Sequence, residues 1–184
     1  MCCAERRRAG PLLGLLLLLA GCGEMGSDLF PSGADQRPPV VSGSQGPGVG
    51  QDAPDFTLSN VAGGTVSLYA TLGAARGAVL YFTMWCPICD SHMSDMQTFV
   101  IPAYPDIPFL ALDYVSGSVE AARSAQSATG WGDTRFTVLA DVGASVEGFY
   151  QAGMAVVVVD RGHVVRMNGE YTRAKLESVL EALP

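Results

Sequence analysis

The chain has 184 residues, of which 48% are hydrophobic and 16% charged, and its formal net charge is −7. This length and apolar content are sufficient for one domain with a buried core. No basic run follows Arg8, so the composition excludes the basic face that nucleic-acid binding requires.

The first 21 residues have the pattern of an export signal. Three arginines at positions 6–8 precede an apolar run over residues 12–20, which is shorter than the roughly 20 residues that a membrane span needs. The run ends in Leu19-Ala20-Gly21-Cys22, which resembles the lipobox of bacterial lipoproteins. This resemblance implies that residues 1–21 are removed and that Cys22 is lipidated. An ordinary signal peptide or a plain membrane anchor is the alternative.

The lipobox resemblance places the mature chain in the cell envelope, anchored to a bacterial membrane and facing the periplasm or the exterior. Residues 1–21 carry three arginines and one glutamate, a net charge of +2, so the remaining chain carries −9. Such an acidic chain would not adhere to anionic lipid, and the lipid on Cys22 must provide the anchor. Residues 23–50 are rich in Gly, Pro and Ser, which predicts a flexible linker with a reach of about 30 Å.

Residues 51–184 are predicted to form a single α/β domain. Short apolar runs alternate with segments that favour helices, and no internal repeat is present. The expected strands are residues 56–58, 66–68, 78–82, 109–113, 136–140, 154–159 and 163–167. The expected helices are residues 87–100, 118–129, 144–150 and 173–183. Ala62-Gly63-Gly64 predicts an N-terminal hairpin, Pro102 is expected to end the first helix, and Thr172 is a candidate N-cap of the last.

The sequence Trp85-Cys86-Pro87-Ile88-Cys89 carries the chemistry of this chain. It follows an apolar strand and begins a helix, whose N-terminus favours the thiolate form of the first cysteine. The thiolate is the nucleophile in disulfide exchange, so this arrangement predicts a redox centre. The alternative is half of a zinc site. Zinc usually takes four ligands, but no second cysteine pair follows and the chain has only two histidines, His92 and His163.

An apolar strand that leads into Cys-x-x-Cys and a helix, within an alternating α/β chain, resembles the thioredoxin-like fold. Ala53-Pro54-Asp55-Phe56-Thr57-Leu58 is similar to the entry segment of the redoxin branch, which holds peroxiredoxins and envelope disulfide reductases. The later strands at 110–113 and 156–160 follow in the expected order. The resemblance implies a central mixed sheet flanked by helices, without metal or other cofactor. It also implies disulfide exchange with exported proteins and with a membrane electron donor or acceptor.

The resemblance also implies a role for each residue of the motif. Cys86 is the expected nucleophile, and Cys89 is the buried resolving thiol that completes a redox-active Cys86–Cys89 disulfide. Trp85 shapes one rim of the site, or simply packs in the core. Pro87 and Ile88 carry no charge, so the helix N-terminus must supply most of the pKa depression.

Three further positions bear on this site. His92 follows Cys89 by three residues, and its protonated imidazole would favour a thiolate, although an exposed histidine without a role is the alternative. Thioredoxins carry a buried acid six residues before the first cysteine, where this chain has Leu80. They also place a cis-proline opposite the cysteines. The aligned residue here is Met154, and we expect a trans bond before it, since a non-proline cis bond costs about 3–4 kcal/mol.

Two other functions remain open at this point. Thr83 stands three residues before Cys86, as in the peroxiredoxin T-x-x-C pattern, and Arg135 is a candidate catalytic arginine. That pattern also requires a proline where this chain has Val79. A non-enzymatic lipoprotein that binds metal or protein is the third possibility. The direction of disulfide exchange is also open, because Pro87 resembles oxidising members whereas the rest of the domain resembles reductases.

Overall fold

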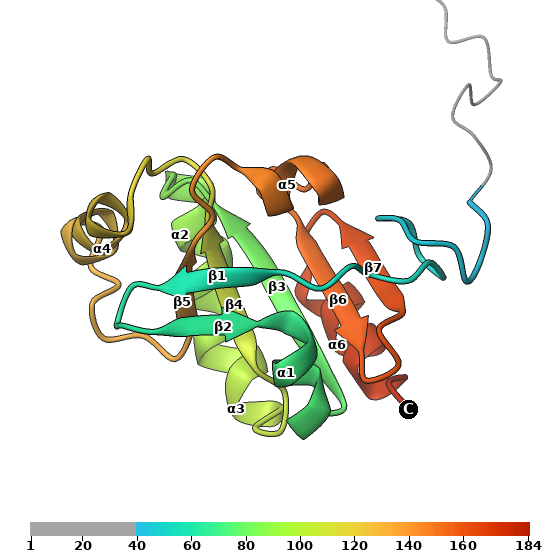
Figure 1. Cartoon of the computed structure of the whole chain (residues 1–184). Coiled ribbons are helices and arrows are strands. Elements are labelled where there is room, and N and C mark those ends of the chain that lie inside the picture. The colour runs from blue at the N-terminus through green and yellow to red at the C-terminus, as the bar shows by residue number, and fades with distance from the viewer. Residues whose placement is uncertain (1–39) are drawn as a thin grey trace, which may run out of the picture. The chain divides into compact units, whose positions relative to one another are not determined.

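The computed structural model describes residues 40–184, and within them seven strands form one mixed sheet (Figure 1). The strand order is β2-β1-β5-β4-β3-β6-β7. Strands β3, β4 and β5 are parallel, whereas β6 pairs with β3 and β1 pairs with β5 in the antiparallel sense. The strands are β1 (Thr57–Asn60), β2 (Thr65–Ser67), β3 (Gly77–Thr83), β4 (Phe109–Asp113), β5 (Thr137–Ala140), β6 (Val156–Asp160) and β7 (Val165–Gly169).

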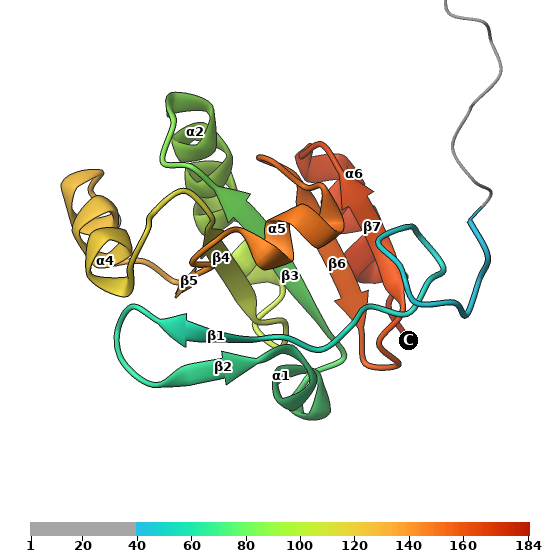
Figure 2. The ribbon, with the colours of Figure 1, turned by 45° about the horizontal axis from the view of Figure 1, so that its top comes forward.

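Helices pack on both faces of this sheet (Figure 2). They are α1 (Leu68–Ala74), α2 (Pro87–Asp95), the π-helical turn η2 (Met96–Val100), α3 (Ile101–Ala103), α4 (Val119–Ala128), α5 (Ser145–Tyr150) and α6 (Arg173–Glu181). Successive side chains of β3 point to opposite faces, because the side chains of a strand alternate. Tyr81 packs in a cluster with residues of α2 and α6, whereas Leu80 and Phe82 pack in a cluster with residues of α1 and α5.

Strand β3 lies within the sheet and carries the cysteine motif at its carboxyl end. All seven of its residues are buried, as expected for a continuous apolar run with helices on both faces. Its neighbour β4 is parallel and pairs Asp113 with Thr83, so both strands end at the same edge of the sheet. Because β6 is antiparallel to β3, the loop that leads into β6 lies beside this same edge, where Phe82 N–H donates to the Ala155 carbonyl at 3.2 Å.

The structure confirms the predicted hairpin, the buried strands and the helix capped by Thr172. It also contains α1, which the sequence analysis did not predict. Leu68 was assigned there to the end of a strand, but it begins this helix. The Ser67 hydroxyl accepts the N–H of Ala70 and caps the helix, so the polar residue that ends β2 also starts α1.

The predicted break at Pro102 is wrong. The chain stays helical from Pro87 to Ala103, although it changes to a π-helical turn over η2, where the N–H of Ile101 reaches the Met96 carbonyl five residues back. Pro102 is the second residue of α3, directly after the π-helical turn.

The predicted linker, residues 22–50, overlaps the folded domain at its C-terminal end. Residues 1–39 lie outside the described part of the chain, and so do the predicted signal peptide and Cys22. Gly50 N–H donates to the Val165 carbonyl at 2.9 Å, and the Asn168 side chain donates to the Pro47 carbonyl at 3.1 Å. The domain therefore begins before Gln51, because backbone groups of this Gly-rich stretch pair with β7. Within residues 40–184, no helix has the length and apolar character needed to cross a membrane.

Candidate active site

Cys86 and Cys89 lie where β3 gives way to α2. Cys86 is the N-cap of the helix, and its Sγ accepts the backbone N–H of Cys89 at 3.3 Å. Cys86 is partly exposed, whereas Cys89 is buried one turn further on, and both are free thiols. Pro87 occupies the first turn, where its ring is pre-organised for the helix. Solvent and a partner protein can therefore reach Cys86 but not Cys89.

The two thiols influence each other's ionisation. Burial raises the pKa of Cys86, and the interaction of its thiol with Cys89 raises it further. Burial also opposes ionisation of Cys89. However, the Cys86 thiol, the N–H groups of Met84 and Cys86 and the Thr83 hydroxyl all favour the Cys89 thiolate, and the net effect is a lowered pKa.

The lowered pKa therefore falls on Cys89 and not on Cys86, where the sequence analysis expected it. The reason is that the donors converge on the inner sulfur. Since each thiol affects the ionisation of the other, the pair loses its first proton more readily than its second. A thiolate on the exposed Cys86 sulfur would be stabilised by the Cys89 N–H.

Trp85 is fixed beside the cysteines by a buried carboxylate that the sequence analysis missed. Its indole Nε1–H donates to Asp113 Oδ2 at 2.7 Å, and its backbone has a φ of +58°, in the left-handed region. Asp113 is fully buried and also accepts the N–H groups of Val115 and Ser116 and the Ser116 hydroxyl. The sequence did offer a signal, because Asp113 ends a buried strand next to the strand that carries the cysteines.

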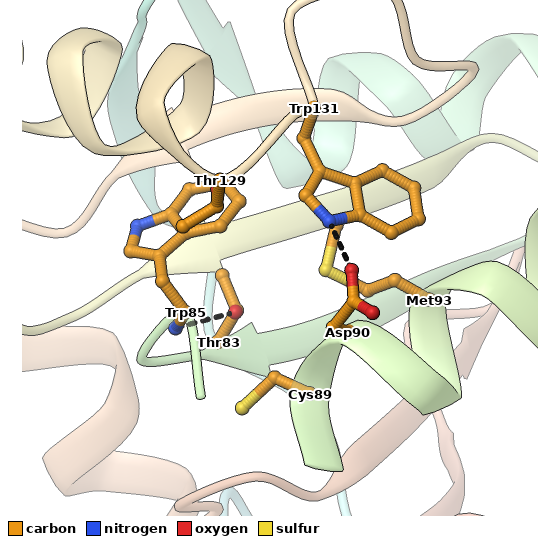
Figure 3. A pocket seen from close by; sticks show the side chains of 7 residues that line it. All are labelled: Thr83, Trp85, Cys89, Asp90, Met93, Thr129 and Trp131. Carbon is orange, nitrogen blue, oxygen red and sulfur yellow. Dashed lines mark hydrogen bonds between the residues drawn. The ribbon is translucent and has the colours of Figure 1, made fainter. Parts of the chain in front are cut away.

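A second tryptophan closes the other side of Cys89 (Figure 3). Trp131 is buried, and its Nε1–H donates to Asp90 Oδ1 at 3.0 Å. Between the two indoles lies a cavity of about 10 Å³, roughly the space that one water molecule occupies. The residues that line it are Thr83, Trp85, Cys89, Asp90, Met93, Thr129 and Trp131. A cavity of this size cannot hold a small-molecule substrate, and Cys86 does not line it.

Met154 occupies the position opposite the cysteines. Its Sδ lies 3.5 Å from Cys86 Sγ, and the peptide bond before it is trans, as expected. The backbone of Met154 has a φ of +59°, which is uncommon for a residue with a side chain.

Leu80 packs on the other face of the sheet, with residues of α1 and α5. The residue of β3 beneath Cys89 is therefore Tyr81, whose pKa is strongly raised by burial and by the adjacent Cys89.

His92 is neither an exposed histidine nor a cation beside the thiols. Its Nδ1 lies 3.1 Å from the Tyr81 hydroxyl, and its ring centroid is 4.9 Å from that of Tyr171. Burial lowers the pKa of His92, with a smaller opposing effect from Asp95, so the imidazole is neutral at pH 7. The lowered pKa disfavours the protonated imidazole on which the electrostatic role predicted for His92 depends, and the contact of His92 with Tyr81 was not foreseen.

The residues of the peroxiredoxin pattern do not gather around Cys86. The Thr83 hydroxyl accepts the Trp85 N–H at 3.1 Å and contributes to the lowered pKa of Cys89, the inner sulfur. Arg135 is exposed, and its backbone N–H donates to Gln97. Among residues 40–184, no side-chain hydrogen bond or ion pair joins Arg135 to either cysteine.

Comparisons with known proteins agree with this fold. The model of the AhpC/TSA family matches residues 49–168. A putative thioredoxin from Neisseria meningitidis is 25% identical, with a TM-score of 0.58 over 71% of this chain and 88% of that one. MTB dsbF is 24% identical, with a TM-score of 0.58 and coverages of 70% and 95%. A secreted Mycobacterium tuberculosis disulfide oxidoreductase homologous to E. coli DsbE is also 24% identical, with a TM-score of 0.54 and coverages of 70% and 96%. No curated protein matches the chain. These similarities confirm the predicted fold class.

Proposed function

The chain belongs to the AhpC/TSA family of thioredoxin-like redoxins, and from that premise we propose that it is a membrane-anchored thiol–disulfide oxidoreductase. Its substrates are exported proteins, and its redox centre is the Cys86–Cys89 pair. One observation carries the proposal. A partly exposed sulfur at a helix N-cap is followed three residues later by a buried sulfur, and the backbone N–H of the second cysteine donates to the first sulfur at 3.3 Å.

The reaction follows from this arrangement. The Cys86 thiolate attacks a partner disulfide, forms a mixed disulfide and expels one partner thiolate, which takes up the proton that Cys89 loses. Cys89, now a thiolate, attacks Cys86 Sγ, so the Cys86–Cys89 disulfide forms and the second partner sulfur leaves as a thiolate, which takes up a proton from solvent. The partner has gained two electrons and the pair has lost two. Run in reverse, the same steps oxidise a partner dithiol, and a membrane electron donor or acceptor returns the pair to its starting state.

The surface around Cys86 supports a protein substrate. Three apolar side chains near this sulfur are exposed: Met84 by 43%, Ile88 by 54% and Met154 by 38%. Unbranched methionine side chains adapt to differently shaped partners, a property suited to an enzyme that serves several exported proteins. The cavity beside Cys89 has no room for a small molecule, and it therefore offers no competing substrate site.

The test is the reduction potential of the pair, measured on residues 40–184, which contain only two of the five cysteines. A value near −270 mV indicates a reductase, and a value near −120 mV indicates an oxidant of exported thiols. A difference of about 30 mV corresponds to about 1.4 kcal/mol for this two-electron couple. If the pair forms no reversible disulfide, the proposal is rejected.

Trapping identifies the roles of the two sulfurs. A Cys89→Ser chain should accumulate mixed disulfides with exported proteins through Cys86, because the thiol that resolves them is missing. A Cys86→Ser chain should accumulate none, since Cys89 is buried. If hydrogen peroxide instead converts Cys86 to a sulfenic acid far faster than it oxidises a free thiol, the enzyme is a peroxidase.

A further inference from the structure

Three sulfur atoms meet at the edge of the sheet. The Cys86 thiol donates to Met154 Sδ at 3.5 Å, and Cys86 Sγ accepts the backbone N–H of Cys89 at 3.3 Å. Cys86 and Met154 are both partly exposed to solvent, whereas Cys89 is buried. Disulfide exchange uses the two thiols, but the thioether sulfur of Met154 takes no part in its chemical steps.

The fold holds the thioether in this position. Strand β6 is antiparallel to β3, so the residues that lead into β6 lie beside the cysteine turn that follows β3. The Phe82–Ala155 hydrogen bond fixes the two segments against each other, and Ala155 N–H closes a tight turn onto the Ala152 carbonyl at 2.7 Å. Within that turn Met154 adopts the left-handed conformation, and its Sδ reaches Cys86.

We propose that the reduced pair and Met154 form a three-sulfur site for a soft monovalent cation, Cu(I). Thiolate and thioether sulfurs are the ligands that select Cu(I) in proteins, whereas Mg²⁺ and Ca²⁺ require oxygen. Metal ions that are harder than Cu(I) lack suitable ligands here, because residues 40–184 contain no group of three His, Cys, Asp or Glu side chains arranged to hold a metal. His92 is the histidine closest in sequence to the cysteine pair. Its Nδ1 faces the Tyr81 hydroxyl and is not directed at a metal ligand position.

The binding step transfers no electrons. Cu(I) replaces the protons of the two thiols, which pass to solvent, and the metal keeps its oxidation state. Oxidation of the pair to a disulfide removes both thiolates, so the same site cannot hold copper and a disulfide at once. Copper occupancy therefore depends on the redox state of the pair, and it does not require that the chain exchange disulfides with any protein.

The experiment is an anaerobic titration of the reduced full chain with Cu(I), in competition with a chromophoric Cu(I) chelator. A Cys86→Ser, Cys89→Ser double variant measures any copper held elsewhere, for example by Cys2, Cys3 or Cys22. After this correction we expect one Cu(I) per reduced chain and none for the oxidised chain.

The thioether is tested with two matched variants. Met154→Leu removes the proposed ligand while keeping a similar volume, and we expect Cu(I) affinity to fall at least tenfold. Met84→Leu removes another exposed methionine near Cys86, and we expect the wild-type affinity. Copper-edge X-ray absorption should count three sulfur neighbours in the wild-type and Met84→Leu chains and two in the Met154→Leu chain.

Equal affinity in the wild-type and Met154→Leu chains, or no Cu(I) bound by the reduced pair, overturns the three-sulfur site. These results are separable from the fate of the proposed function. A chain that forms a reversible disulfide but binds no Cu(I) loses only the metal site. A chain that binds Cu(I) through three sulfurs but forms no reversible disulfide loses only the oxidoreductase role.

Discussion

At the scale of single residues, Asp113 organises the surroundings of the cysteines. Its buried carboxylate accepts one hydrogen bond from the Trp85 indole and three from Val115 and Ser116. A carboxylate that is buried away from water is stable only when its oxygens accept hydrogen bonds, and here four donors supply them. The orientation of Trp85 therefore depends on a residue from a different strand.

Replacing Asp113 with Asn should destabilise the protein and loosen Trp85. The amide NH₂ would face N–H donors, and hydrogen bonds to a charged acceptor would be lost, so we expect a loss of about 2 kcal/mol in the free energy of unfolding. Urea unfolding monitored by tryptophan fluorescence measures this. Asp106→Asn is the control. Asp106 pairs with Arg76 at the surface, so this substitution should lower the free energy of unfolding much less. Equal losses in both variants contradict the role of Asp113.

His92 should make stability depend on pH in mildly acidic solution. Burial lowers its pKa in the folded chain, so the unfolded chain binds a proton first as the pH falls through about 6.5. The contribution of the neutral imidazole to stability is therefore present above pH 6.5 and is lost as the pH falls towards the folded pKa. Unfolding free energies between pH 7.5 and 5.5 should fall less steeply in His92→Gln than in wild type. Identical slopes would contradict this account, since both chains retain His163.

Sequence analysis identified the residues of the site that are close in sequence. The cysteine spacing and the N-terminal position in the helix are local features, and the structure shows both. Asp113, Tyr81 and Trp131 could not be assigned, because their contacts depend on the register between strands and on how α2 packs over the sheet. The lowered pKa of Cys89 could not be foreseen either, since it depends on which donors reach the inner sulfur.

At the scale of secondary structure, the segment before β1 pairs with β7. Such pairing covers backbone groups at the edge of a sheet that would otherwise face solvent. The predicted strands were correct where the sequence has a continuous apolar run, as in β3, β4 and β6. The Gly-rich segment has no such run, and its contacts are made by backbone groups and one asparagine side chain. Composition alone therefore placed the domain boundary too late.

A chain that begins at Gln51 should be less stable than one that begins at Val40. It loses the hydrogen bonds from Gly50 to Val165 and from Asn168 to Pro47, each worth about 1 kcal/mol, so we expect a loss of about 2 kcal/mol. Chemical unfolding of the two truncated chains measures the difference. Amide hydrogen exchange should be faster near Val165 in the shorter chain. Equal denaturant midpoints for the two chains would show that residues 40–50 contribute nothing to stability.

At the scale of the whole molecule, the proposed function requires a link to the membrane. The described residues contain no spanning helix, and residues 22–184 carry too much negative charge to bind anionic lipid by charge. The link that we propose is the lipid on Cys22, in the segment that resembles a lipobox.

Replacing Cys22 with Ser should release the protein from the membrane. Acyl chains anchor a protein by burying apolar surface, and serine cannot be lipidated in this way. In a bacterial host, the wild-type chain should sediment with membranes and the Cys22→Ser chain should remain in the soluble fraction. Its Cys86–Cys89 pair should keep the wild-type reduction potential. A Cys22→Ser chain that still sediments with membranes would show that another segment is the anchor.

The π-helical turn η2 has a consequence for changes in chain length. Its hydrogen bond spans five residues, so the turn holds one residue more than an α-helical turn would. Deleting exposed Thr98 should convert η2 to an α-helical turn while Met96 and Val100 stay on the buried side. Deleting Glu177 from α6 should instead rotate everything after it by about 100° and turn Leu180 out of the core. The chain should therefore tolerate the loss of one residue from η2 without any change at the cysteines.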